Sequence, residues 1–310
     1  MTMRAIGMSG LEVAPVALGG NVFGWTADEA ASFAILDAFV DAGGTMIDTA
    51  DVYSAWVPGH VGGESEAVIG RWLKRSGKRD KVVIATKVGF MAGLKPETIA
   101  PTCDASLGRL GVEAIDLYYQ HQDDQSVPLA DSLGAFDALR RAGKIRAIGL
   151  SNFSAERVEE ALAVSIEAGF EQPAALQNWY NLVERGKYEG ALQDVALARG
   201  LSVFPYYGLA NGFLSGKYRT KDDLGKSPRG LRTIEYLEDR GLKVLAAVEE
   251  VAADSGAAMA TVALAWLKAQ PGITAPIASA TSLEQARELI AALTLDLTPG
   301  QIERLNEASA

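Results

Sequence analysis

The sequence predicts a (β/α)8 barrel that spans residues 1–310 as a single domain. Short apolar runs alternate along the chain with longer segments of helical periodicity, which is the pattern of a parallel sheet covered by helices. Several of these runs end in a polar residue, as expected where the carboxyl ends of barrel strands carry a functional site. The length of the chain is also typical of one α/β barrel.

The predicted elements follow one another in barrel order. Residues 3–13 hold two short apolar pieces around Ser9 and Gly10, typical of a small hairpin before the main fold. Strands are expected to end near Gly19, Asp48, Lys87, Gln120, Ser151, Gln177 and Tyr206, and an eighth to cover residues 272–278. Helices are expected over residues 27–42, 64–75, 96–110, 129–142, from about 154, and over 191–199, 237–254, 259–269, 282–292 and 299–308. The last two helices are additional C-terminal elements.

One segment interrupts this alternation. After Tyr206 no strand or helix pattern is visible for about thirty residues, and connections of that length without their own structure are usually functional loops. The segment is basic, with Lys217, Arg219, Lys221, Lys226, Arg229 and Arg232. We therefore expect a long functional loop after the seventh strand.

Composition excludes several classes of partner. The formal charge of -10 argues against nucleic acid, whose binding needs clustered lysine and arginine, so a small molecule is the expected partner. With one cysteine, Cys103, and two histidines, neither an internal disulfide nor a metal cluster is expected. The N-terminal residues lack the apolar core of a secretory signal, and residues 257–267 are too short to span a bilayer. A cytoplasmic protein without membrane contact is expected, of undetermined oligomeric state.

Four polar side chains follow three of the predicted strands. Asp48 ends one strand with Tyr53 on the loop beyond it, Lys87 ends the next strand, and His121 follows the third. If these strands are adjacent and parallel, the four side chains meet at one end of the sheet. A phenol, with a pKa of about 10, donates a proton poorly at neutral pH unless a cation stabilises the phenolate. We expect Lys87 to lower the pKa of Tyr53, Asp48 to pair with Lys87, and His121 to orient a substrate oxygen.

Each of these residues also has a structural interpretation when taken alone. Asp48 could cap a turn, Lys87 could be a solvated strand end, Tyr53 could be loop surface, and His121 could be a core histidine. These interpretations do not explain why all four occur together.

The same four residues resemble the catalytic tetrad of the aldo-keto reductases, and the resemblance covers nearly the whole chain. Residues 62–66 (Gly-Gly-Glu-Ser-Glu) are similar to the family segment that leads into its second helix, and residues 116–121 to the strand before its catalytic histidine. Residues 143–153 (Gly-Lys-Ile-Arg-Ala-Ile-Gly-Leu-Ser-Asn-Phe) and 177–181 also resemble family segments. The resemblance implies the barrel fold and a nicotinamide cofactor lying in the barrel mouth.

The resemblance also implies a set of cofactor-binding residues. Near the nicotinamide these are Gly20, Asn21, Asp48, Ser151, Asn152, Gln177 and Tyr206, where hydroxyl and amide groups fix the ring without titrating. On the loop over the pyrophosphate they are Leu209, Gly212, Leu214 and Lys217, with Arg229 or Arg232 reaching a phosphate. At the adenosine end they are Ser279, Thr281, Gln285 and Glu288. For Ser151 an N-cap, and for Gln177 a barrel-core position, remain alternatives.

The sequence is compatible with both NADPH and NADH as the cofactor. Ser279 stands where the family usually has glycine or lysine, and Ser282 where a basic residue often binds the 2′-phosphate. NADPH is favoured, with charge from Lys217 and Arg229 or Arg232, while NADH is not excluded. Neither the G-x-G-x-x-G fingerprint nor a P-loop occurs, so dinucleotide binding would be of the barrel type.

The expected function is oxidoreduction of an aldehyde or ketone, or the reverse, with hydride transfer at the nicotinamide and Tyr53 as general acid or base. The expected substrate pocket is apolar and is formed by Trp25, Tyr53, Trp56, His121 and Trp179. A second hypothesis is a nicotinamide-binding regulatory subunit resembling channel beta subunits, which would carry the same tetrad. A third and weaker one is a barrel isomerase or hydrolase, because fold alone does not separate these functions.

Overall fold

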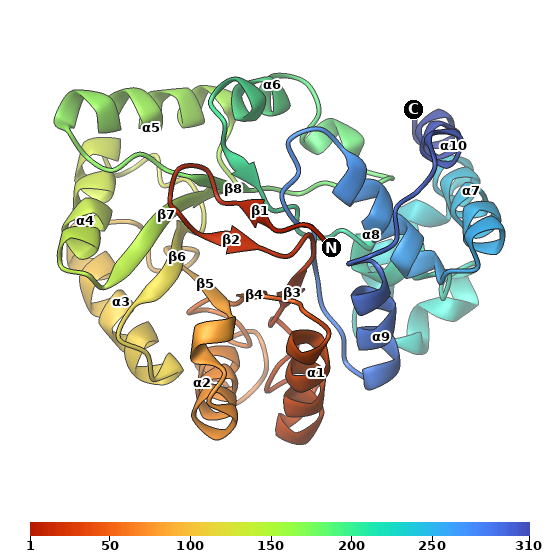
Figure 1. Cartoon of the computed structure of the whole chain (residues 1–310), viewed down its shortest axis with the longest axis horizontal. Helices are drawn as coiled ribbons and strands as arrows, with labels where there is room; N and C mark the ends of the chain where they lie inside the picture. Colours follow the sequence, from red (N-terminus) through yellow and green to blue (C-terminus); the bar gives the residue numbers. More distant parts are fainter.

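The computed structural model describes residues 1–310 and has the predicted architecture. Its main sheet contains the eight parallel strands β3 (Ala17–Gly19), β4 (Met46–Asp48), β5 (Val83–Val88), β6 (Ile115–Gln120), β7 (Ile145–Ser151), β8 (Ala175–Gln177), β9 (Ser202–Val203) and β10 (Ile277–Ala278). The strands lie in the order β10-β3-β4-β5-β6-β7-β8-β9, and a parallel bridge between Val203 and Ile273 joins the two ends of this order. The sheet is therefore a closed (β/α)8 barrel surrounded by helices (Figure 1).

The seventh and eighth strands are shorter than predicted. The strand predicted to end near Tyr206 is β9, which has two residues and ends at Val203. The strand predicted over residues 272–278 is β10, which has only the two residues Ile277 and Ala278. Pro205 and Pro276 explain this, because proline has no N–H to donate to a strand ladder. Both prolines still accept a hydrogen bond, Pro205 from the Ile277 N–H and Pro276 from the Ala17 N–H.

The helices lie close to their predicted ranges. They are α1 (Glu29–Asp41), α2 (Glu64–Ser76), α3 (Pro96–Leu110), α4 (Leu129–Arg141), α5 (Ala155–Ala168), α6 (Ala191–Ala198), α7 (Asp239–Ser255), α8 (Met259–Ala269), α9 (Leu283–Ala291) and α10 (Pro299–Ser309). Local capping chemistry fixes several ends. Ser154 caps α5 by accepting from the Arg157 N–H, and Thr298 with Gln301 forms a capping box at α10. No helix combines the length and apolar character needed to cross a membrane.

The amino-terminal end of the barrel is closed by the predicted hairpin, β1 (Arg4–Ala5) and β2 (Glu12–Val13), which crosses the barrel in Figure 1. Its Ile6, Leu11 and Val13 pack with inward-facing strand residues, five of which are alanines. The remaining space is filled by a few large side chains such as Tyr119. A Cβ on Gly149 of the adjacent strand would lie 2.3 Å from the Tyr119 ring, so glycine is required there. Ligand access is thus confined to the opposite end.

The basic segment after β9 is a long connection, as predicted, but it contains short helical turns. These are the 3-10 helices η3 (Ala210–Ser215), η4 (Lys221–Lys226) and η5 (Gly230–Leu237). Leu224 and Tyr236 are buried and attach the segment to the barrel. The turns are too short to produce a helical periodicity in the sequence.

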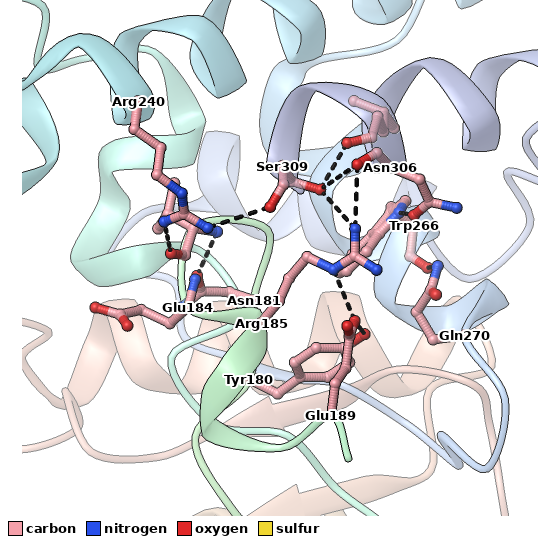
Figure 2. A network of polar contacts seen from close by, with 12 residues as sticks. Tyr180, Asn181, Glu184, Arg185, Glu189, Arg240, Trp266, Gln270, Asn306 and Ser309 are labelled. Atoms are coloured by element: carbon pink, nitrogen blue, oxygen red, sulfur yellow. Dashed lines mark hydrogen bonds and ion pairs between the residues drawn. The ribbon is translucent and has the colours of Figure 1, made fainter.

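The loop after β8 is fastened to the C-terminal helix by the polar network in Figure 2. The Arg185 guanidinium donates to Glu189 at 2.8 Å and to the Asn306 carbonyl at 3.2 Å. Arg240 donates to the carbonyl oxygens of Val183 and Ser309. Because cations at a helix C-terminus satisfy free carbonyls, this network holds α10 against the loop that begins with Asn178 and Trp179.

Candidate active site

The centre of the candidate site is the Lys87 ammonium at the end of β5. Its Nζ donates three hydrogen bonds, to Asp48 Oδ2 at 2.7 Å, to the Thr49 carbonyl at 2.6 Å and to the Tyr53 hydroxyl at 2.9 Å. An ammonium group has three N–H bonds, so all of them are used. The predicted meeting of Asp48, Tyr53 and Lys87 is present in the structure.

Strand register explains how these groups meet. Asp48 is paired with Ala85 of β5, so Lys87 lies two residues further along the neighbouring strand and on the same face. From across the barrel, Gln177 Nε2 donates to the second Asp48 oxygen, Oδ1, at 2.9 Å. Both Lys87 and Asp48 are almost completely buried, so the carboxylate is fixed from two sides in a water-poor environment.

The expectation that the pKa of Tyr53 lies below its usual value is wrong. Burial, followed by the negative charge of Asp48, raises the pKa of the Tyr53 phenol well above its usual value. Burial also lowers the pKa of Lys87, although Asp48 opposes this shift. The Lys87 charge is largely balanced by Asp48 and does not outweigh the loss of water around the phenol. Tyr53 is therefore protonated at neutral pH, as a proton donor must be.

His121 lies beside this group. Its ring centroid is 6.0 Å from that of Tyr53 and 5.1 Å from that of Phe90. Burial and the Lys87 charge lower the pKa of His121 well below its usual value, so the imidazole is neutral. Its buried Nδ1 has no hydrogen-bond partner within the chain. His121 is thus available to hydrogen-bond a ligand without adding charge.

The predicted nicotinamide-binding residues lie on the next two strand ends and beyond. Asn152 Nδ2 donates to the His121 carbonyl at 2.9 Å and to Ser151 Oγ at 3.1 Å. Tyr206 donates its hydroxyl hydrogen to Asn152 Oδ1 at 2.6 Å. Asn152 has a left-handed backbone with φ 61°, an uncommon conformation for a residue other than glycine that is frequent at functional sites.

A cavity of about 480 Å³ adjoins Asn152 and Tyr206. None of the tetrad lines it, and the rest of its lining is Phe90, Gln122, Asp123, Gln125, Ser154 and Arg157. Buried polar atoms without a partner in the chain occur in the same group of loops: Asn178 Oδ1, Trp179 Nε1 and Asn211 Oδ1. Buried polar groups are nearly always hydrogen-bonded, so unpartnered ones indicate a ligand or water. A nicotinamide cofactor, with its amide, ribose and phosphate groups, fits this donor and acceptor set.

The predicted aromatic pocket is only partly assembled. Trp25 and Trp56 pack edge to face at 5.6 Å, and Trp56 lies 6.2 Å from the Tyr53 ring. Trp179 is not part of this cluster, because it packs against Tyr207 at 4.9 Å and Tyr206 at 6.3 Å. The place of Trp179 in the substrate pocket stays a prediction. The strand pairing of Trp179 with Tyr206 places Trp179 with the seventh strand end.

The cations of the basic segment fall into two groups. Arg219 pairs with Glu249 and Lys226 with Asp223, so these two charges are neutralised on the surface. No carboxylate pairs with Lys217, Arg229 or Arg232. The Lys217 ammonium lies 4.9 Å from the Tyr218 ring centroid, and the Arg229 guanidinium lies 5.5 Å from that of Trp25. Lys221 has no carboxylate partner either. Lys217, Arg229 and Arg232 are the cations predicted to contact phosphate.

Of the predicted residues before Lys217, Leu209 immediately precedes η3, and Gly212 and Leu214 lie on it. Gly212 has φ 92°, and a Cβ there would come within 2.8 Å of Lys217 Cε. Glycine at this position therefore gives the lysine side chain room to cross the turn.

The predicted adenosine end lies between β10 and α9. Ser279 Oγ donates to Asn21 Oδ1 at 2.7 Å, which links this end to the loop that contains Gly20. Gln285 Oε1 accepts from both the N–H and the hydroxyl of Thr281. Burial, followed by the nearby Glu284, raises the pKa of Glu288. None of the residues predicted at this end is basic, but Arg229 Nη2 donates to the same Asn21 Oδ1 at 3.4 Å.

Two neighbours of the site were not predicted. Phe90, which contacts His121, follows β5 in an exposed loop, and Tyr207, with φ 57°, adjoins Tyr206. The sequence offered one signal, since Tyr207 stands where the family commonly has serine. The position of Phe90 depends on a loop path that no periodicity describes.

Comparison with known proteins agrees with this geometry. A model of the aldo/keto reductase family matches residues 15–310. The uncharacterized oxidoreductase YrpG of Bacillus subtilis is 34% identical over 99% of this chain and 95% of its own length. The aldo-keto reductase yakc [NADP(+)] of Schizosaccharomyces pombe is 29% identical over 90% of this chain and 83% of its own length. Human aflatoxin B1 aldehyde reductase member 4 is 31% identical over 94% of this chain and 92% of its own length.

The family match covers nearly the whole chain and includes all four residues of the predicted tetrad. These relatives are named as an oxidoreductase and two reductases. The chain belongs to the aldo/keto reductase family and is an oxidoreductase of that family.

Proposed function

We propose that this protein reduces an aldehyde or ketone to an alcohol with NADPH, or catalyses the reverse oxidation, and that Tyr53 exchanges the proton. The observation that carries the proposal is the Lys87 ammonium, which donates to both Asp48 and the Tyr53 hydroxyl from a fully buried position. A purely structural ion pair between Lys87 and Asp48 would not require a phenol hydroxyl as a third partner at the mouth of the barrel.

The residues of the chain divide the chemistry between them. When bound, the reduced cofactor supplies the hydride that the carbonyl carbon accepts. Tyr53, protonated at neutral pH, donates its hydroxyl proton to the carbonyl oxygen, and Lys87 stabilises the phenolate that remains. Neutral His121 hydrogen-bonds the same oxygen and orients it. Asp48 keeps the ammonium in place, and Gln177 keeps Asp48 in place.

Ser151, Asn152 and Gln177 would hold the carboxamide of the cofactor, with Tyr206 against the ring. Lys217, Arg229 and Arg232 would neutralise its phosphates, because these cations have no carboxylate partner of their own. The preference for NADPH depends on these cations, and one relative is named for NADP(+).

Lys217→Ala is expected to weaken the binding of NADPH by about tenfold, the size of one lost charged contact, and to change NADH binding less. Dissociation constants from nicotinamide fluorescence titrations measure both. Lys226→Ala is the matched control, because Lys226 is already paired with Asp223. An equal loss of affinity for NADPH and NADH would show that Lys217 does not bind the 2′-phosphate.

A cofactor titration followed by a panel of aldehydes, ketones and alcohols, monitored by nicotinamide absorbance, tests the function itself. Turnover that depends on NADPH and on a carbonyl compound is expected. Tight cofactor binding without turnover of any member would contradict the enzymatic proposal.

A further inference from the structure

One carboxyl group next to the active-site residues has no part in the chemistry described above. Asp51 lies three residues after Asp48 and two before Tyr53. Its backbone N–H donates to the Lys87 carbonyl at 3.2 Å, so the loop that carries Tyr53 is attached here to the strand that carries Lys87. Its side-chain Oδ1 is buried and has no hydrogen-bond partner within the chain. A buried carboxylate oxygen without a partner needs an explanation.

The other charged groups around Asp51 come from α2, α3 and β5. Glu66 of α2 is completely buried and accepts from Thr86 Oγ1 at 2.5 Å and from Arg109 Nε at 2.7 Å. A second Arg109 nitrogen lies 2.6 Å from the same Glu66 oxygen. Arg109 of α3 is thus committed to Glu66, and the two charges balance each other.

Three carboxylates act on the buried Lys87 ammonium and favour its charged form: Asp48 most strongly, then Asp51 and Glu66. Asp48 is its direct partner. Because Glu66 already has a guanidinium partner, Asp51 is the one carboxylate of the three without an ion pair of its own. A charge that nothing else neutralises acts over a longer distance in a water-poor interior.

We propose that Asp51 is a positioning residue that supports the positive charge of Lys87 from beyond the Asp48 ion pair, and so helps the lysine to stabilise the Tyr53 phenolate. The proposal rests on the proposed role of Tyr53. Asp48 accepts hydrogen bonds through both oxygens, whereas Asp51 leaves its buried Oδ1 without a partner.

The effect of Asp51 on the charge of Lys87 is expected to depend on pH, because the Asp51 carboxyl group itself titrates. Burial, followed by the charge of Glu66, raises the pKa of Asp51 to about 6, while a hydrogen bond from the Val52 backbone N–H and then the charges of Arg109 and Lys87 oppose the shift. Asp51 is therefore mostly ionised at pH 7 and becomes neutral as the pH falls through 6. Tyr118 on β6 also faces this group, but burial raises the pKa of its phenol well above the usual value, so it stays uncharged.

Nuclear magnetic resonance of protein labelled with ¹³C at lysine Cε tests the proposal, with the Lys87 signal assigned by its absence from Lys87→Met. In Asp51→Asn, Lys87 is expected to lose its proton at a pH lower by about half a unit or more than in the wild type. Glu113→Gln, which removes an exposed carboxylate near the opposite end of β6, is the matched control and is expected to leave the titration unchanged. If Lys87 titrates identically in the wild type, in Asp51→Asn and in Glu113→Gln, the proposal is overturned.

A second measurement applies if Asp51→Asn does not fold. In the wild type, the Lys87 Cε signal is expected to shift with the same midpoint as a ¹³C-labelled Asp51 carboxyl, and the absence of a shared midpoint would overturn the proposal. Neither measurement needs turnover. A protein that reduces no carbonyl compound would refute the proposed function, while these titrations would still decide the role of Asp51.

Discussion

Tyr53→Phe is expected to lower kcat for carbonyl reduction by about 10²- to 10⁴-fold, the usual contribution of a positioned general acid. The substitution removes only the hydroxyl that receives a hydrogen bond from Lys87 at 2.9 Å, and phenylalanine keeps the ring that packs near Trp56. Cofactor affinity is expected to stay nearly unchanged, because the hydroxyl has no role in holding the dinucleotide. Steady-state kinetics and a fluorescence titration of NADPH measure the two effects separately.

The control for this variant is Tyr188→Phe. Tyr188 is buried and its hydroxyl has no partner within the chain, so the same atom is removed away from the tetrad. Wild-type kcat is expected for this control. Retained reduction of a simple aldehyde by Tyr53→Phe would refute the role of Tyr53 as the acid.

Lys87→Met is expected to abolish activity and also to destabilise the fold. The variant leaves the Asp48 carboxylate buried with no cation beside it, which typically costs about 3–5 kcal/mol of unfolding free energy. Denaturant unfolding followed by circular dichroism measures the loss. For comparison, Lys226→Met removes one partner of an exposed pair and is expected to cost at most about 1 kcal/mol.

The double variant Asp48→Asn/Lys87→Met separates the two effects. It removes both buried charges, so we expect it to recover most of the lost stability but none of the activity. A single Lys87→Met variant as stable as the wild type would mean that the pair is not buried as described. An active double variant would mean that neither charge takes part in the chemistry.

Much of the site could be predicted from the sequence, because its residues lie at the ends of apolar strands. In a parallel barrel, strand ends share one rim, so Asp48, Lys87 and His121 had to be neighbours once their strands were adjacent. The helices were predicted equally well, since apolar periodicity and caps such as Ser154 are local signals. The short helical turns of the basic segment were missed for the same reason, because they are too short for a periodic pattern.

What the sequence did not predict depends on contacts between distant segments. The place of Trp179 is set by Tyr206 and Tyr207, which follow a different strand. The direction of the Tyr53 pKa shift depends on how completely water is excluded, which residue order does not describe. The lack of an ion pair at Asp51 is visible only when the bond between Arg109 and Glu66 is known.

The most direct test of the central claim, that the tetrad directs a proton and a hydride to one carbonyl group, is isotope transfer. Reduction of an aldehyde with NADPH carrying deuterium at both C4 positions of the nicotinamide is followed by mass spectrometry of the product alcohol. We expect one deuterium on the former carbonyl carbon from the wild-type protein, and labelled alcohol to form about 10²- to 10⁴-fold more slowly with Tyr53→Phe. An alcohol formed without the label, or labelled alcohol formed at the same rate by both proteins, would contradict the claim.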